Sequence, residues 1–149
     1  ELVSLLKENP HVTIELSAHC DYKGSAEYNK QLSQRRAEAV VDYLIKHGVA
    51  KDRLTPMGYG KSRPKTIRKK LTEKYPWLKE NDVLTEDFIK RQTKEHQDIC
   101  NQLNRRTEFI VLRTTYGLFD EKGQLRQQPQ PRKREERGQS ADEFNIVVE

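Results

Sequence analysis

Hydrophobic and polar residues follow two different periods in the first half of the chain. Over residues 11–18 apolar and polar positions alternate, which predicts a strand with one buried face. The apolar positions of this strand are Val12, Ile14 and Leu16. Over residues 25–47 apolar positions recur every three and four residues, which predicts a helix that begins near Ser25 or Asn29 and stops at Gly48. The core face of this helix is expected to comprise Ala37, Val40, Val41, Leu44 and Ile45.

Weaker patterns flank these two elements. Residues 1–8 form the end of a helix that Pro10 prevents from continuing, and residues 53–58 form a second strand whose alternation is irregular. Residues 107–112 are rich in β-branched and aromatic side chains and predict a final strand. Because the chain begins inside a helix, we expect it to be an excerpt of a longer protein. An export signal or a lipid anchor would then lie upstream.

The segment between the second and last strands has a helical character of its own. It predicts a short helix over 65–75, a turn at 76–78 and another helix that begins at Thr85 with two acids in its first turn. The apolar contacts of this last helix are expected to come from Phe88, Ile89, Ile99 and Leu103. Trp77 can either pin the segment to its own domain or anchor a partner, and the first role is the commoner one for a lone tryptophan.

The composition indicates one modest globular domain with polar appendages, because 34% of the 149 residues are apolar and 34% are charged. No apolar run approaches the length of a membrane span, and nothing at Glu1 resembles a signal peptide. The net charge of +5 raises the possibility of nucleic-acid binding. The basic clusters at 65–70 and 132–137 lack interleaved aromatic residues, so we interpret the charge as a solvated surface without a nucleic-acid partner. Such a surface suits anionic polymers or phospholipid head groups.

Candidate catalytic and metal-binding residues are present but do not form a recognisable arrangement. The candidates are His11, His19, Cys20, Asp21, His47 and His96. No two histidines have a helical i, i+4 spacing, and no paired carboxylates flank a reaction centre. The two cysteines are too few for a disulfide scaffold and have no zinc spacing. We therefore expect neither an enzyme nor a bound metal or cofactor.

The stretch from His19 to Ala37 contains the most informative chemistry. The first strand ends at Asp21, and Arg36 lies within the first turns of the following helix, so the two side chains can meet in space. A carboxylate beside a guanidinium suits a zwitterionic ligand head. On residue types alone an internal salt bridge is the commoner explanation. Asn29 and Leu32 precede Arg36 at helical spacing, where Asn29 can satisfy a loop backbone and Leu32 can be core.

Several ordered motifs across about a hundred residues favour the ligand-binding explanation over the internal salt bridge. They are His19-Cys20-Asp21, Asn29 to Ala37, Gly48-Val49, Gly58-Tyr59-Gly60 and Asn104-Arg105-Arg106 followed by Thr107-Glu108-Phe109. This series resembles the OmpA-like peptidoglycan-binding domain of the OmpA/Pal/MotB group. The resemblance implies an α/β fold, an α+β sandwich in strand-helix-strand-helix-strand order, with a small mixed sheet covered by helices. The domain would span 1–116 with a helical insertion at about 61–98, and 117–149 would form a C-terminal extension.

The resemblance also implies a function and a ligand set. The function is recognition, without catalysis, of the diaminopimelate residue of peptidoglycan stem peptides, with Asp21 and Arg36 holding its head group. The implied set is completed by Asn29, Leu32, Arg105 and Cys20, where Cys20 replaces the usual threonine. Spacing alone does not choose between Arg105 and Arg106. The domain would anchor a larger periplasmic protein, attached to the outer membrane through a region outside this chain, to the cell wall. The alternative is a protein-interaction module of an envelope secretion or motility assembly, without peptidoglycan binding.

Two further expectations follow from the resemblance and the composition. Cys20 ends the first strand and Cys100 precedes Arg105, which the resemblance places near the same pocket, so a Cys20–Cys100 disulfide is expected in an oxidising compartment. Residues 127–140 are rich in Pro, Gln and charge, so they are expected to be linker-like and dispensable for binding. A strand-like segment at 144–148 follows them.

Overall fold

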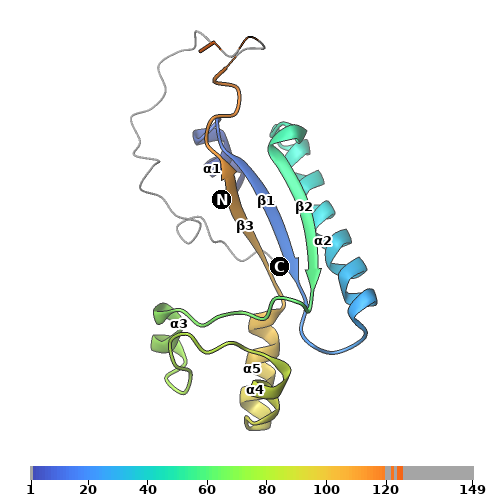
Figure 1. Cartoon of the computed structure of the whole chain (residues 1–149), viewed down its shortest axis with the longest axis vertical. Coiled ribbons are helices and arrows are strands. Elements are labelled where there is room, and N and C mark those ends of the chain that lie inside the picture. The colour runs from blue at the N-terminus through green and yellow to red at the C-terminus, as the bar shows by residue number, and fades with distance from the viewer. Residues whose placement is uncertain (1, 120–121, 123, 126–149) are drawn as a thin grey trace.

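A three-stranded mixed sheet forms the centre of the molecule (Figure 1). The computed structural model describes residues 2–119, 122 and 124–125. Its elements are α1 (Leu2–Glu8), β1 (Thr13–His19), α2 (Ala26–Lys46), a 3-10 turn (Lys51–Arg53), β2 (Leu54–Gly60), α3 (Lys69–Lys74), α4 (Glu86–Lys90), α5 (Lys94–Asn104) and β3 (Arg106–Arg113). The strand order is β2-β1-β3, with β2 parallel and β3 antiparallel to β1. The expected mixed α/β architecture is confirmed.

One hydrophobic core joins the sheet to α1 and α2. Alternation places Ile14 and Leu16 of β1 on the covered face, where both are fully buried. The predicted face of α2 packs against them: Ala37, Val41 and Leu44 are buried, and Val40 and Ile45 are partly buried at the edge of this core. The side chain of Ser25 caps α2 by accepting a hydrogen bond from the backbone N–H of Tyr28 at 3.1 Å. The first core therefore follows the sequence pattern closely.

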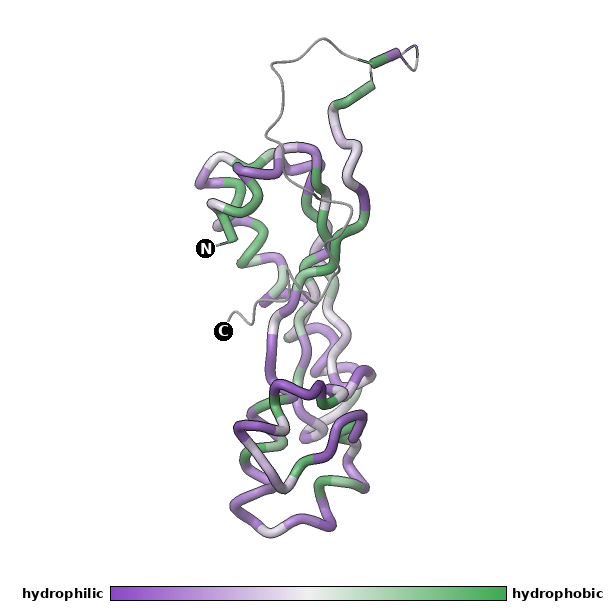
Figure 2. Tube along the Cα trace, turned by 90° about the vertical axis from the view of Figure 1, so that its left-hand side faces the viewer, coloured by the Kyte–Doolittle hydropathy of each residue, from purple (hydrophilic) through white to green (hydrophobic). Residues whose placement is uncertain are grey.

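A second core lies between the end of β2 and the start of β3, below the sheet in Figure 1. Its buried members are Ile67, Leu78, Leu84, Ile89 and Cys100. Figure 2 shows apolar stretches in this part as well as in the part that contains the sheet. Trp77 packs against the second core and stacks on His96 with 3.7 Å between ring centroids. These contacts hold the parts of the insertion together.

Two helices of the insertion differ from the sequence-based expectation. The helix expected over 65–75 is confined to α3, because Thr66 forms a bridge with Val83 and the backbone of Ile67 bonds to Asp82. The single helix expected from Thr85 to Leu103 is two helices, α4 and α5. Thr93 starts α5 by accepting a hydrogen bond from the N–H of His96 at 3.2 Å, which ends the continuity with α4.

The remaining sequence-based expectations concern the ends of elements and the last part of the chain. The strand expected to stop at Gly58 continues to Gly60. The linker-like residues 127–140 and the strand-like residues 144–148 lie outside the described residues. None of the described helices combines the length and the apolar character that a bilayer crossing requires.

Candidate functional site

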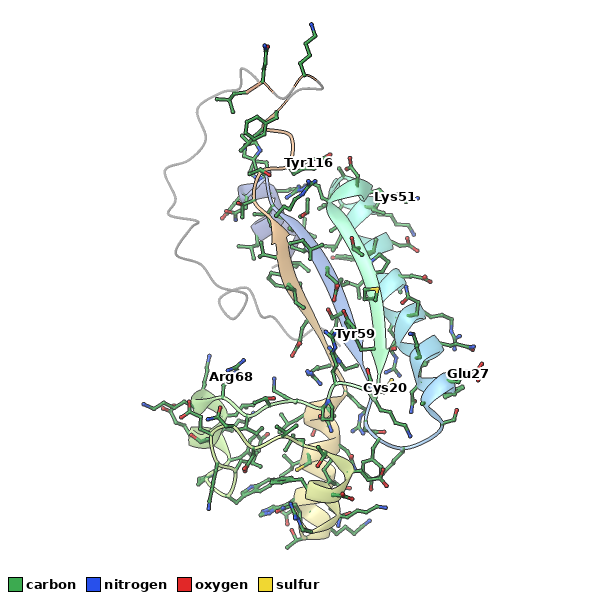
Figure 3. The ribbon with its side chains drawn as sticks, in the orientation of Figure 1. Cys20, Glu27, Lys51, Tyr59, Arg68 and Tyr116 are labelled. Carbon is green, nitrogen blue, oxygen red and sulfur yellow. The ribbon has the colours of Figure 1, made fainter. Side chains whose placement is uncertain are left out.

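A pocket opens at the end of the sheet where β1 stops. The last residue of β1, His19, pairs with Gly60 of β2 on one side and with Arg106 of β3 on the other. α5 leads directly into β3 at this point, and the loop after β1 leads to α2 beside it (Figure 3). The pocket has a volume of about 360 Å³ and is lined by Ala18, His19, Arg36, Gln102, Arg105, Arg106 and Thr107. It therefore combines residues of the sheet, α2 and α5.

Asp21 forms an ion pair at the edge of this pocket, but its partner is not the expected one. Its Oδ2 accepts a hydrogen bond from Nη1 of Arg105 at 2.5 Å, and its Oδ1 accepts one from the backbone N–H of Lys23 at 3.0 Å. The antiparallel pairing of His19 with Arg106 accounts for this partner, because it brings the residues just beyond that pair close together. The direct Asp21–Arg36 pairing that spacing suggested is therefore replaced by Asp21–Arg105.

Arg36 reaches the same pocket from α2 and is exposed there. Among the described carboxylates, none lies within ion-pairing distance of its guanidinium. Its charge acts on Cys20, where burial raises the pKa of the thiol and Arg36 opposes that rise. The pocket thus contains one cation that no carboxylate of the described chain neutralises.

Arg106 lines the pocket but is held by the fold. Its Nε donates to Oε2 of Glu108 at 2.7 Å and its Nη2 donates to the backbone oxygen of Arg63 at 3.1 Å. Beside it, burial first and the Arg106 charge second lower the pKa of His19 to about 4, although Glu108 opposes this shift. His19 is therefore neutral at pH 7. Of the two arginines that spacing left equivalent, Arg105 has the exposed side chain and Arg106 the buried one.

Three other residues of the expected ligand set do not line the pocket. Asn29 is buried, and its Nδ2 donates to the backbone oxygen of Lys23 at 2.7 Å, so it satisfies the loop backbone. Leu32 is partly buried. Cys20 is buried, and its Sγ lies 3.5 Å from the backbone oxygen of Asn29. Asn29 therefore holds the loop backbone, and none of these three residues belongs to the described lining of the pocket.

The expected Cys20–Cys100 disulfide is wrong, because both cysteines are free thiols. Cys20 packs against the first turns of α2, whereas Cys100 belongs to the second core. Burial raises the pKa of Cys100 to about 11, so the thiol stays protonated at neutral pH. The separation of the two cores keeps the two thiols in different environments.

Two residues at or near the pocket were missed by sequence reasoning. Gln102 lines it from the last turn of α5 and precedes Arg105 by three positions, a spacing that could have revealed it. Lys61 donates from Nζ to the backbone oxygens of Tyr22 at 3.2 Å and Gly24 at 2.7 Å. No signal in the sequence connects Lys61 with a loop that lies 37 residues earlier.

The fold and the pocket define a small α/β domain with a basic pocket at one end of a mixed sheet. The sequence profile of the OmpA family matches residues 1–75, about half of the chain, and the chain belongs to this family.

Individual relatives agree with this assignment over part of the chain. Outer membrane porin F of Pseudomonas fluorescens is 44% identical over 63 residues, which cover 42% of this chain and 19% of that protein. The peptidoglycan-associated lipoprotein of Brucella melitensis is 39% identical over 62 residues, which cover 42% of this chain and 37% of that protein. The matched part therefore spans well under half of either relative.

Two solved structures resemble part of this chain. The crystal structure of the peptidoglycan-associated lipoprotein from Burkholderia pseudomallei has a TM-score of 0.42 and 33% identity, and the match covers 45% of this chain and 57% of that one. A putative MotB-like protein from Desulfovibrio vulgaris has a TM-score of 0.48 and 21% identity, with coverage of 78% and 58%.

Proposed function

We propose that this domain binds peptidoglycan through the diaminopimelate residue of the stem peptide and performs no catalysis. The observation that carries the proposal is the convergence of Arg36 and the Asp21–Arg105 pair at one pocket of about 360 Å³. The name of the peptidoglycan-associated lipoproteins among the relatives supports peptidoglycan as the polymer that is bound.

The charges suggest how a zwitterionic head would bind. Two guanidinium groups, from Arg36 and Arg105, stand beside one carboxylate, Asp21, which leaves a surplus positive charge for a ligand carboxylate. The ligand ammonium would bind to Asp21, whose two oxygens can accept more hydrogen bonds than Arg105 and Lys23 supply. The neutral imidazole of His19 adds no competing charge at pH 7.

The proposal extends to the place of the domain in the cell. A domain that holds the stem peptide would anchor a larger periplasmic protein to the cell wall, and an outer-membrane attachment would lie outside this chain. The competing function is a protein-interaction module in an envelope secretion or motility assembly that does not bind peptidoglycan. The described pocket favours the first function, because it matches the chemistry of a small zwitterion.

The test is the affinity of purified variants for a diaminopimelate-containing muropeptide. Asp21→Ala and Arg36→Ala should each weaken binding by about 2–5 kcal/mol, or about thirty-fold to several-thousand-fold, because each leaves an opposite ligand charge unpaired. Asn29→Ala and Arg105→Ala should cost about 1–2 kcal/mol, since Asn29 supports the loop and Arg105 shares its charge with Asp21.

A matched control is available on the same helix. Arg35 is exposed, neighbours Arg36 and does not line the pocket, so Arg35→Ala should bind as the unmodified chain does. A muropeptide with lysine in place of diaminopimelate lacks the second carboxylate and should bind more weakly. Wild-type affinity in folded Asp21→Ala and Arg36→Ala proteins would refute the proposal and favour the interaction module.

A further inference from the structure

The loop that presents Asp21 is attached to the second core. Tyr22 immediately follows Asp21, and its ring packs against the buried cluster of the insertion formed by Ile67, Leu78, Leu84, Ile89 and Cys100. Nζ of Lys90, at the end of α4, lies 5.9 Å from the centre of the same ring. The side chain next to Asp21 is therefore anchored in a part of the chain that begins about forty residues later.

The backbone of the same loop is held from outside. Nζ of Lys61 donates to the backbone oxygens of Tyr22 and Gly24, and Nδ2 of Asn29 donates to the oxygen of Lys23 between them. Three consecutive carbonyl groups thus have side-chain donors that lie outside the loop. Lys61 is the first residue after β2, so the start of the insertion fixes the loop as well. Such contacts restrict the positions that the Asp21 carboxylate can take.

The other half of the ion pair depends on the same core. Arg105 follows the last residue of α5, and α5 is packed through Cys100, which is fully buried, and Leu103. Gln102, which lines the pocket, lies on this helix too. The second core therefore supports Asp21 through Tyr22 and Arg105 through α5.

We infer that the insertion is a structural part of the ligand site, and that Tyr22 is a positioning residue that holds Asp21 opposite Arg105. This inference rests on the proposed function and adds a role for the α3–α5 segment, which otherwise could serve as a separate docking surface. Tyr22 acts through Asp21 and the loop. Its loss should loosen the loop and weaken ligand binding, because a carboxylate that samples many positions makes fewer productive contacts.

The experiment compares three variants of the chain in muropeptide affinity, melting temperature and amide hydrogen exchange. Tyr22→Ala should weaken binding about ten-fold or more and speed exchange at the N–H of Lys23, which donates to Asp21. Tyr22→Phe should restore both, because the ring keeps its packing. Leu71→Ala is the matched control, since Leu71 packs against the same core from α3, a helix that carries neither Tyr22 nor Arg105. It should lower the melting temperature while affinity stays unchanged.

A fourth variant, Lys61→Met, tests the loop without removing an aromatic ring. Lys61→Met takes away the donor to two loop carbonyl groups and should weaken binding about three-fold to ten-fold, with faster exchange in the same loop. Lys61→Met tests the inference by itself if Tyr22→Ala does not fold.

The outcomes separate this inference from the proposed function. Wild-type affinity in Tyr22→Ala or, failing that protein, in Lys61→Met would overturn the inference, while a strong loss in Asp21→Ala would still support peptidoglycan binding. An equal loss of affinity in Leu71→Ala would also overturn it, because general destabilisation would then explain the effect. Wild-type affinity in Asp21→Ala would refute the proposed function itself.

Discussion

Arg105 and Arg106 are neighbours in the sequence but occupy opposite environments. The side chain of Arg105 is 45% exposed at the pocket and pairs with Asp21, whereas that of Arg106 is 6% exposed and bonds to Glu108 and to the backbone of Arg63. Arg105 has an extended backbone just before β3 begins at Arg106, and adjacent side chains of an extended chain point to different sides, so one arginine can reach the pocket while the next secures the strand. The consequence at the residue scale is that Arg36 and Arg105 present exposed guanidinium groups to the pocket, whereas Arg106, which also lines it, is paired with Glu108.

His19 gives the domain a predictable sensitivity to acid. Its folded-state pKa of about 4 lies below the ordinary value of 6.5, because burial and Arg106 disfavour the imidazolium. The unfolded chain therefore binds this proton at a higher pH than the native domain does. The resulting contribution of His19 to the free energy of unfolding is fully present above about pH 6.5. As the pH falls toward 4, the free energy of unfolding decreases by about 2–3 kcal/mol.

Urea unfolding between about pH 7 and pH 4 measures this loss, with His19→Gln as the control. The variant should show a flatter profile in this window because it has no imidazole to protonate. Burial acts to raise the pKa of Glu108, but the charge and hydrogen bond of Arg106 and the charges of His19 and Lys65 together outweigh it, so the net shift is downward and Glu108 stays ionised over most of the window. Identical slopes in the two proteins would show that His19 is not responsible.

At the scale of elements, α2 and β2 approach each other through glycine. A Cβ added to Gly58 would lie 2.2 Å from the backbone nitrogen of Gln34 and 2.6 Å from Oγ of Ser33. Hydrogen bonds join the two elements at this contact. The N–H of Gly58 donates to Oε1 of Gln34 at 2.8 Å, and the N–H of Gly60 donates to Oγ of Ser33 at 2.9 Å. The Gly58-Tyr59-Gly60 motif thus fixes the spacing between helix and strand.

Gly58→Ala should therefore destabilise the domain by about 3 kcal/mol or more, because backbone atoms of α2 must move to admit the methyl group. Gly117→Ala is an informative comparison: its φ is +72°, but an added Cβ meets no atom within 4 Å. Backbone strain alone should cost about 1 kcal/mol there. Chemical denaturation of both variants compares the two effects, and equal losses would contradict the packing explanation.

The elements differ in how far the sequence predicts them. The helical period of α2 and the alternation of β1 come from residues close together in the chain, so both were predicted with their buried faces. The break between α4 and α5 depends on Thr93 acting as a cap, which competes with the apolar spacing that runs across it. The partner of Asp21 could not be predicted by local spacing, because the register of β1 and β3 joins residues 84 positions apart.

At the scale of the whole molecule, the pocket depends on both cores but on a limited part of the chain. Its lining residues fall between positions 18 and 107, and the residues that hold the Asp21 loop fall within the same range. Deleting residues 127–140 should therefore leave muropeptide affinity and melting temperature unchanged. Calorimetric titration of the truncated chain checks this expectation, and a large loss of affinity would mean that the tail contributes to the site.

The pocket and α1 lie at opposite ends of the sheet (Figure 1). A pulling force between a ligand at Asp21 and the start of the chain would run along β1, the central strand, which is already extended and spans about 20 Å. Arg53 reinforces the far end, where its guanidinium donates to the backbone oxygens of Leu6, Asn9 and Val12. Under tension the domain should therefore behave as a short, stiff coupling that transmits load with little elongation.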